Sequence, residues 1–306
     1  FRGLAAIVLI IIVSMLIYKT NILSAKANYA TTRAIILGWN GDFNGSVKKY
    51  QEALVYDVPG KYEIRHRFGQ YILEQSQKSA NLDASKNFKP EFIGAIKTAI
   101  AEVQKNADEN PLDYLPELYI ARMNIILGKG DPKSPYNDEA LAHGFKALEL
   151  SPTFVRTNYE IAQGYLNKKD IKQARDYFKR AAELNPKVGL SLWYWGIVEF
   201  EQGNVQLGID LISQALEKGF NASESDYSKM VTVFYRVGDY NKLVLIYQKL
   251  IALNPNNPQY HASVAVAYAR VGKIDEAVKE ARIAAKFDKA FEAEARRFVQ
   301  SLGREF

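Results

Sequence analysis

Residues 158–186, NYEIAQGYLNKKDIKQARDYFKRAAELNP, decide the fold of this chain. The stretch begins with one amphipathic helical pattern, breaks at the polar NKKD and continues with a second helical pattern. Residues 261–288, HASVAVAYARVGKIDEAVKEARIAAKFD, repeat this arrangement. The position of Ala174 recurs at intervals of 34, 35 and 34 residues, at Gly208, Leu243 and Ala277. A period this regular indicates a helix–turn–helix unit stacked on copies of itself.

Each unit places small and aromatic residues where two helices must pack. Ala162 and Tyr165 share one face of the first helix, and Ala174, Phe178 and Ala181 share one face of the second. Small residues let the helices approach closely, and the aromatic rings fill the remaining space. The predicted ends of first helices carry Gly203, Gly238 and Gly272, and the predicted ends of second helices carry Pro186 and Pro255.

Together these features resemble the tetratricopeptide repeat family. The resemblance implies an all-α fold, a right-handed helical solenoid of about seven helix pairs with an N-terminal hydrophobic helix and a C-terminal capping helix. Two units depart from the family pattern. Gly208 and Phe220 stand where alanine and proline are usual, and Leu243 and Leu250 each replace an alanine. We expect looser or shifted packing in the unit that contains the two leucines.

The pattern divides the chain into four parts. Residues 1–26 form a hydrophobic anchor or assembly helix, and residues 27–152 hold degenerate helix pairs of the tetratricopeptide type. Residues 153–291 hold four tetratricopeptide units, and residues 292–306 form a capping helix with the charged side that a solenoid end needs. Two inserted loops, rich in polar and helix-breaking residues, are predicted at residues 76–90 and 129–137.

The N-terminus carries an uncharged apolar run over residues 3–18. Such a helix spans roughly 24 Å, short of a ~30 Å hydrocarbon core, although Arg2 and Lys19 could snorkel to the interfaces. The run is apolar all round, unlike an amphipathic helix of a solenoid. A buried solenoid helix and a signal peptide are the alternatives, and the membrane orientation stays open. The residues assigned to this membrane or assembly helix are Leu4, Ile7, Val8, Ile11, Ile12, Met15 and Tyr18.

The composition suits a helical repeat protein. The 306 residues include 40 Lys and Arg against 34 Asp and Glu, a net charge of +6. Both signs are spread along the helices without a basic cluster that interleaves with aromatic residues, so nucleic acid is not an expected partner. The lack of cysteine excludes disulfides and thiolate metal sites. The triplets NGS and NAS mark Asn44 and Asn221 as glycosylation acceptors by pattern alone.

The sequence offers little for catalysis. Its three histidines, His66, His143 and His261, stand in separate predicted helices, where packing is the simpler interpretation. The chain has no HExxH, phosphate-loop, GxSxG or EF-hand pattern. We therefore expect a protein that is not an enzyme and that has no cofactor-binding or metal-binding residues.

The junction between the apolar run and the repeats carries a narrower resemblance. Residues 17–74 resemble the region after the last membrane helix of bacterial O-antigen ligase-like proteins with repeat-bearing tails. The matching residues are Asn21, Gly60, Glu63, Ile64 and Arg65. In that family the glycan-transfer chemistry belongs to the multi-helix membrane part. The resemblance therefore implies a membrane helix and repeats outside the cytoplasm, but no ligase activity in this chain.

A different interpretation starts from Phe1. Processed type IV pilins also begin with phenylalanine and a long apolar helix, which bundles in a filament core, and residues 4–37 contain neither proline nor glycine. Such pilins usually have glutamate as the fifth residue, and Ala5 departs from that pattern. Whether Phe1 is a processed terminus or a fragment boundary is left open.

We expect a scaffold on the outer side of the membrane or at the cell surface, which mediates protein–protein assembly through its hydrophobic helix and solenoid surface. The partner is a protein, through self-association or a peptide segment in the groove, with the membrane contacted by the N-terminal helix. No residue pattern supports glycan binding. The first alternative is a pilin-like subunit of an extracellular filament, and the second is the tail of an O-antigen ligase-like glycan-transfer protein.

In tetratricopeptide proteins one face of each first helix lines the inner groove. That face corresponds here to Arg156, Tyr159, Gln163, Asn167, Trp193, Ile197, Phe200, Tyr235, Arg236 and Arg270. The dicarboxylate clamp of chaperone-binding members needs lysine and asparagine where Tyr159 and Gln163 stand, so we expect an apolar or aromatic peptide segment instead. Trp193 and Phe200 are candidate contacts because their helix is apolar on two sides, with core packing as the alternative.

Overall fold

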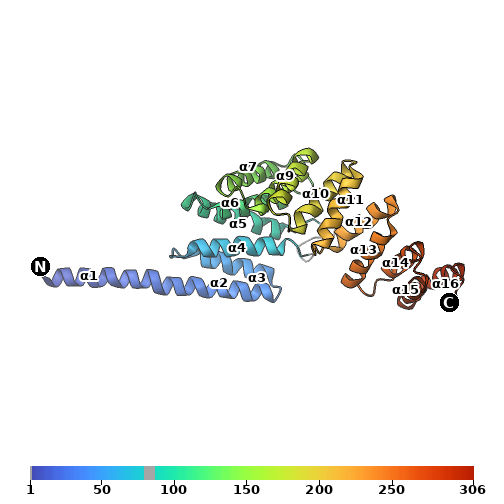
Figure 1. Cartoon of the computed structure of the whole chain (residues 1–306). Helices are drawn as coiled ribbons and strands as arrows, with labels where there is room; N and C mark the ends of the chain where they lie inside the picture. Colours follow the sequence, from blue (N-terminus) through green and yellow to red (C-terminus); the bar gives the residue numbers. More distant parts are fainter. Residues whose placement is uncertain (1, 79–86) are drawn as a thin grey trace. The chain divides into compact units, whose positions relative to one another are not determined.

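The computed structural model describes residues 2–78 and 87–306 (Figure 1). Within these ranges the chain consists of helices and their connections, without a β-strand. It separates into two compact units, Phe1–Phe220 and Asn221–Phe306, and each is described by itself. The predicted all-α solenoid of helix pairs is confirmed.

The unit Phe1–Phe220 contains one long helix and five antiparallel helix pairs. α2 pairs with α3, α4 with α5, α6 with α7, α8 with α9 and α10 with α11. First helices of neighbouring pairs also contact each other, α4 with α6 and α6 with α8. The elements are α1 (Arg2–Ile17), the π-helical turn η1 (Tyr18–Leu23), α2 (Ser24–Trp39), α3 (Phe43–Val55), α4 (Lys61–Gln75), α5 (Pro90–Glu109), α6 (Tyr114–Gly128), α7 (Pro135–Leu150), α8 (Val155–Asn167), α9 (Ile171–Leu184), α10 (Gly189–Glu201) and α11 (Val205–Glu217).

The unit Asn221–Phe306 contains two further pairs and a closing helix. α12 pairs with α13 and α14 with α15, and α16 covers the last pair through Ala295 and Val299, which pack against Ala265 and Val278. These contacts bury one face of α16, as expected for a capping helix. The elements are α12 (Glu224–Val237), α13 (Tyr240–Leu253), α14 (Pro258–Arg270), α15 (Ile274–Phe287), the 3₁₀ turn η3 (Lys289–Phe291) and α16 (Glu292–Ser301).

The small and aromatic residues of the α8–α9 pair lie in its core. Ala162, Ala174, Phe178 and Ala181 are all 0% exposed, and the first three belong to one apolar cluster. Of the two predicted inserted loops, the one between α6 and α7 is short, because α6 ends at Gly128 and α7 begins at Pro135. The other falls largely on residues 79–86, which lie outside the described residues.

The turns within the pairs use left-handed backbone conformations. Gly203, Gly238 and Gly272 have φ of 88°, 74° and 80°, which glycine adopts without a steric penalty. Lys169 occupies the corresponding place between α8 and α9 with φ of 61°. A residue with a side chain pays roughly 1–2 kcal/mol to adopt the left-handed conformation. The α8–α9 turn is therefore strained, whereas the turns that carry glycine are not.

The α10–α11 pair has an unusually close helix contact built on glycines. A Cβ atom added at Gly208 would lie 2.7 Å from the carbonyl oxygen of Gly196, and one added at Gly196 would lie 2.9 Å from that of Gly208. At the start of α10, a Cβ added at Gly189 would lie 2.8 Å from the Cβ of Phe220. Larger residues at these positions would force the two backbones apart.

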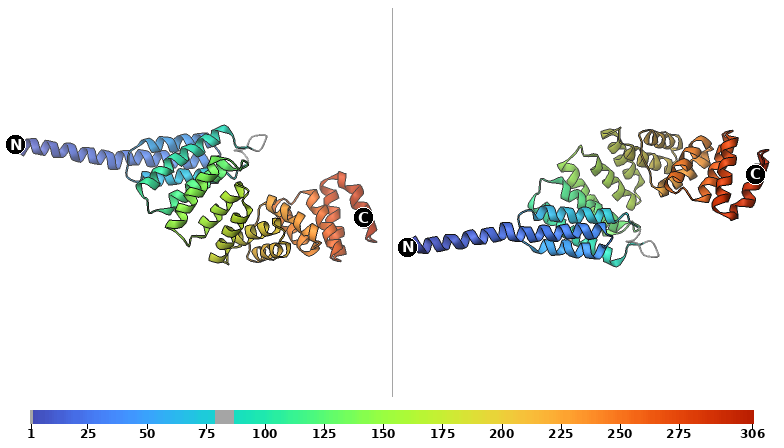
Figure 2. Two further views of the ribbon diagram at one scale, coloured as in Figure 1. Left: turned by 90° about the horizontal axis from the view of Figure 1, so that it is seen from above. Right: turned by 90° about the horizontal axis from the view of Figure 1, so that it is seen from below.

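The N-terminal helix runs without a break through α1, η1 and α2 (Figures 1 and 2). Gly3–Trp39 form a 37-residue helix with the length and composition of a membrane-crossing segment. The assigned residues Leu4, Ile7, Val8, Ile11, Ile12, Met15 and Tyr18 are all between 48% and 68% exposed. Burial against the repeats begins only at Leu23 and Ala27. The alternative that α1 is a buried solenoid helix is therefore wrong.

Candidate functional site

A continuous set of aromatic and charged side chains crosses the first helices of the unit Phe1–Phe220. We call it the tyrosine–arginine band. It begins on α4 and α6, where the rings of His66 and Tyr119 stack with centroids 4.7 Å apart. The Arg122 guanidinium lies over the Tyr119 ring at 5.9 Å. The band consists of His66, Tyr119, Arg122, Arg156, Tyr159, Glu160 and Tyr194.

Glu160 connects the α6 and α8 parts of the band. Its Oε1 lies 3.1 Å from Nε of Arg122 and 2.5 Å from Nε of Arg156, so two guanidinium groups share one carboxylate. The Glu160 side chain is 6% exposed, whereas those of Arg122 and Arg156 are 24% and 40% exposed. The carboxylate balances one of the two guanidinium charges, so these three side chains together carry a net charge of +1.

Tyr159 extends the band toward α10. Arg156 lies over its ring at 5.0 Å, and the rings of Phe178 and Tyr194 meet it edge-on at 5.6 and 5.2 Å. Burial and the neighbouring Tyr194 phenol raise the pKa of Tyr159, and burial raises that of Tyr119. Both phenols are neutral near pH 7, so among these groups the arginines and Glu160 determine the charge.

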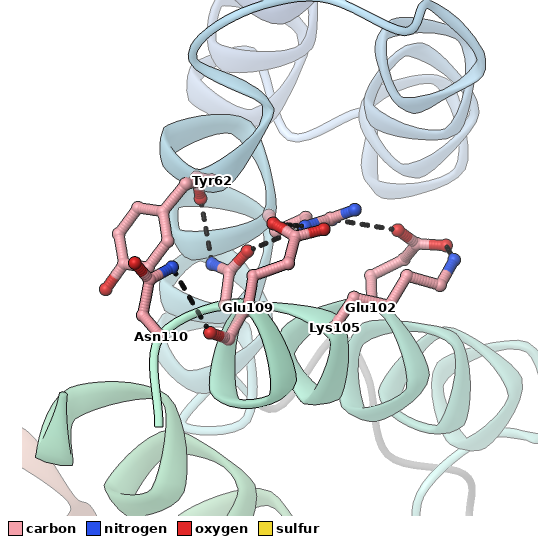
Figure 3. A network of polar contacts seen from close by, with 7 residues as sticks. Tyr62, Glu102, Lys105, Glu109 and Asn110 are labelled. Atoms are coloured by element: carbon pink, nitrogen blue, oxygen red, sulfur yellow. Dashed lines mark hydrogen bonds and ion pairs between the residues drawn. The ribbon is translucent and has the colours of Figure 1, made fainter. Parts of the chain in front are cut away.

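A buried polar network holds α4, which carries His66, against α5. Arg65 donates from Nη1 to Oδ1 of Asn106 at 3.1 Å and to Oε2 of Glu109 at 2.7 Å, and Glu102 lies 3.6 Å from its Nε. Asn106 in turn donates to the carbonyl oxygen of Tyr62 at 2.9 Å. Figure 3 shows this network between the two helices.

The residues on which the sequence resemblance to O-antigen ligase-like proteins was based lie in different environments, and one of them belongs to this network. Arg65 is buried within the network, and Ile64 lies in the core. Gly60 has φ of 89° just before α4 begins, and Glu63 pairs with Arg67 on the same helix at 2.7 Å. Gly60, Ile64 and Arg65 thus have structural roles, whereas Glu63 makes only a surface ion pair. Asn21 lies on η1, where it donates to the Thr20 hydroxyl.

The predicted groove residues on α8 and α10 have different environments. Arg156 and Tyr159 belong to the band. Asn167 donates to the Ile125 carbonyl oxygen at 2.8 Å and to the Asn137 side chain at 3.1 Å, so it connects α8 to α6 and α7. Gln163, Ile197 and Phe200 are half-buried, and the backbone and Cβ of Phe200 lie against Gly208.

Trp193 requires a correction. We expected an exposed binding aromatic, but the side chain is 0% exposed and its ring lies 5.2 Å from that of Phe220. It fills the core of the α10–α11 pair, as the packing alternative predicted. Its neighbour Tyr194 contributes to the band instead. The physical reason is that Phe220, which stands where other units have proline, provides an aromatic surface for Trp193 to cover.

The remaining predicted groove residues belong to the unit Asn221–Phe306. Tyr235 is 67% exposed, and Arg236 and Arg270 are also exposed. The Arg270 guanidinium lies over the Tyr240 ring at 5.7 Å.

Five members of the band were missed from the sequence, and one of them is Tyr194, which follows the wrongly assigned Trp193 on α10. His66, Tyr119 and Arg122 lie in degenerate pairs whose groove face was not assigned, and Glu160 was not considered because a lone acidic residue on a helix is usually solvated. The 34-residue period gave no signal for this pair, because Arg122 is the ninth residue of α6 and Arg156 is the second residue of α8.

The three histidines pack in separate places. His66 belongs to the band, and Nδ1 of His143 lies 2.5 Å from the buried Glu117. His261 places Nδ1 2.6 Å from Glu280 and Nε2 2.8 Å from the Pro255 carbonyl oxygen. Within residues 2–78 and 87–306, no group of three or more His, Asp or Glu side chains has the arrangement of a metal site.

Comparison with known proteins agrees with this architecture. Residues 155–188, which include α8 and α9, match the tetratricopeptide repeat family. A tetratricopeptide repeat protein from Parabacteroides merdae has a similar fold, with a TM-score of 0.53 and 12% sequence identity, over 90% of this chain and 99% of that one. The match and the fold support a tetratricopeptide repeat protein.

Two curated relatives share shorter stretches. The TPR repeat-containing thioredoxin TTL4 of Arabidopsis thaliana is 32% identical over 97 residues, which cover 31% of this chain and 14% of that protein. The small glutamine-rich tetratricopeptide repeat-containing protein 2 of Mycosarcoma maydis is 40% identical over 53 residues, which cover 17% and 15%. The chain thus matches about one seventh of the length of each relative.

Proposed function

We propose that this chain is a membrane-tethered interaction scaffold whose tyrosine–arginine band binds a protein segment. The observation that carries the proposal is the pair of arginines, Arg122 and Arg156, that share the single carboxylate of Glu160. Tetratricopeptide repeats are generally interaction scaffolds rather than enzymes, and the band lies on first helices, the surface that this class uses for binding.

The chemistry of the band defines the partner segment. Aromatic and arginine side chains are the residues most enriched among binding hot spots. The unbalanced positive charge favours a carboxylate, which a guanidinium can bind with paired hydrogen bonds. The rings of Tyr119, Tyr159 and Tyr194 favour an apolar or aromatic neighbour. We therefore expect a segment in which an acidic residue stands close to an aromatic one.

Fluorescent peptides test this assignment directly. A panel pairs phenylalanine or tyrosine with aspartate or glutamate, and a matched panel replaces each acid by its amide. We expect the acidic peptides to bind better, and Arg156→Ala or Arg122→Ala to weaken binding by roughly 2 kcal/mol, about thirty-fold.

Arg175→Ala is the matched control for these variants. Arg175 lies on α9, the second helix of the same unit, and pairs with Asp176 at 2.8 Å. This variant should bind like the native chain. Equal binding of acid and amide peptides, or an equal loss in the control, would contradict the proposed partner chemistry.

The membrane tether is the second part of the proposal. The support is a helix of 37 residues whose N-terminal half is apolar and is not covered by the described residues. Uncovered apolar area of this extent favours lipid or neighbouring subunits. The full chain should float with lipid vesicles, and deletion of residues 1–18 should abolish flotation while the helical circular dichroism is kept. Fibres that form without lipid would favour the filament alternative.

We infer further that the repeats lie on the outer side of the membrane. The resemblance of residues 17–74 to the region after the last helix of O-antigen ligase-like proteins supports this side. The chain lacks cysteine, so a single Trp39→Cys variant offers one reactive thiol. A membrane-impermeant maleimide should label this thiol on intact bacterial cells that express the chain. Labelling only after lysis would place the repeats in the cytoplasm.

A further inference from the structure

Two connections in the unit Phe1–Phe220 expose apolar side chains more fully than α1 does. Val55, the last residue of α3, is 80% exposed, and Leu112, between α5 and α6, is 86% exposed. The most exposed large apolar side chain described in α1 is Leu4, at 68%. Single exposed apolar residues are ordinary, so the meaning of these two depends on where they lie.

Both connections lie at the end of the bundle from which α1 departs. Nζ of Lys19 lies 2.9 Å from Oδ2 of Asp57, so the α3–α4 connection lies beside the end of the apolar run. The Tyr62 hydroxyl at the start of α4 donates to the Asp113 carboxylate, which brings the α5–α6 connection alongside. Figure 2 shows α1 leaving the bundle at this end.

The residues at the C-terminal end of the apolar run, Tyr18 and Lys19, are typical of a membrane–water interface. Residues 3–18 carry no charge, Tyr18 is 51% exposed, and Lys19 follows directly. Tyrosine and lysine at the end of an apolar helix mark the headgroup level of a bilayer. A bilayer around α1 would therefore end where Val55 and Leu112 project from their connections.

We propose that Val55 and Leu112 insert into the lipid interface beside α1, so that the repeats contact the membrane at a second place. This inference rests on the proposed membrane tether, and it deepens it by naming the surface that meets the lipid. It holds for either orientation of the chain, because the connections follow α1 on whichever side the repeats lie. Apolar side chains at headgroup depth add affinity in proportion to the area that they bury.

Single-cysteine variants of the full chain test the contact. Val55→Cys, Leu112→Cys and the control Trp39→Cys are each labelled with the environment-sensitive dye NBD and reconstituted in vesicles of phosphatidylcholine and phosphatidylglycerol. Trp39 is 82% exposed at the opposite end of α2, so it matches the other two in exposure but not in place. We expect blue-shifted emission, quenching by spin-labelled lipid and protection from iodide at positions 55 and 112, and none of these at position 39.

Three outcomes would overturn the inference. If the chain floats but all three probes behave like position 39, the tether stands and the second contact is wrong. Protection from iodide without quenching by spin-labelled lipid would indicate a protein neighbour and exclude lipid. Failure of the chain to float would defeat the proposed tether and, with it, this inference.

A second variant separates insertion from mere proximity. In a Val55→Asp, Leu112→Asp chain, a probe at Asn110→Cys should lose its lipid quenching while flotation through α1 is unchanged. Both substituted side chains are exposed, so the fold is not expected to suffer, and circular dichroism checks this. Lipid quenching retained in the aspartate chain would show that the apolar side chains do not make the contact.

Discussion

The α8–α9 and α10–α11 pairs begin 34 residues apart and have the same helix lengths to within one residue, yet they expose different side chains. Tyr159 and Trp193 hold equivalent places in the two first helices. Tyr159 lies in the tyrosine–arginine band, whereas Trp193 is 0% exposed against Phe220.

Two departures from the repeat pattern account for the difference. Gly208 replaces the alanine found at Ala174, and with Gly196 it lets α10 and α11 approach within backbone contact. Phe220 replaces the proline found at Pro186 and supplies the ring that covers Trp193. The repeat period thus predicts where helices lie, while individual substitutions decide which of their side chains reach the surface.

The largest difference in stability between the two helix pairs is expected for the variants Trp193→Ala and Tyr159→Ala. Removing a buried tryptophan costs about 3–5 kcal/mol, because it leaves a cavity in the core. Tyr159 is half-buried, so its truncation should cost clearly less stability and should instead weaken peptide binding. Denaturant midpoints followed by circular dichroism measure both variants. Equal midpoint shifts would mean that the two positions are equivalent after all.

Substituting leucine at Gly208 and at Ala174, which hold equivalent places, compares how closely the two helices of each pair approach. Gly208→Leu should destabilise the chain by about 3 kcal/mol or more, and Ala174→Leu by about 1–3 kcal/mol, because both overpack the pair but the glycine contact has no room for a Cβ. Thermal unfolding of the two variants gives the ranking. The closer approach of α10 and α11 would be in doubt if Ala174→Leu proved the more damaging.

Phe220→Ala should uncover Trp193 without removing it. Loss of a partly buried phenylalanine costs about 2 kcal/mol and should shift the Trp193 emission to longer wavelength. Trp39 and Trp195 are replaced by phenylalanine in the measured chain, so that the signal reports one residue. The same two replacements in a chain that keeps Phe220 form the control. An emission maximum unchanged by Phe220→Ala would show that another side chain shields the ring.

The smallest expected effect concerns the turns of the two pairs. Lys169 has φ of 61° where the next pair has Gly203 with φ of 88°. Lys169→Gly should stabilise the chain by about 1 kcal/mol, because it relieves the left-handed strain. Gly203→Lys should cost a similar amount for the backbone alone, since nothing lies within 4 Å of a Cβ there. If the free energy of unfolding changed in the same direction in both variants, this explanation of the turns would be wrong.

The fold was largely predictable from the sequence, because its determinants are local. Small residues, turn glycines and closing prolines repeat at a fixed interval, and each specifies contacts within its own unit or with the next. The band was only partly predictable. Arg156 and Tyr159 followed from the repeat register, but Glu160 matters because arginines from two helices converge on it, and that convergence depends on how α6 packs against α8.

Trp193 was misjudged for the complementary reason. Its helix is apolar on two sides, a pattern that suits either a binding surface or a doubly covered core helix. The deciding residue, Phe220, lies 27 positions later and was noted only as a missing proline. Departures from a repeat pattern are therefore informative about packing even where they weaken the match to a family.

The unbroken helix from α1 through η1 into α2 has a mechanical consequence. A flexible linker would let the solenoid rotate and tilt freely relative to its tether. Here the tether and the first repeat helix are one rod of 37 residues, about 56 Å long. Any tilt or axial rotation of α1 in its surroundings is thus passed to α2 and the pairs stacked on it, and the direction in which the tyrosine–arginine band faces is set by the helix rather than by diffusion.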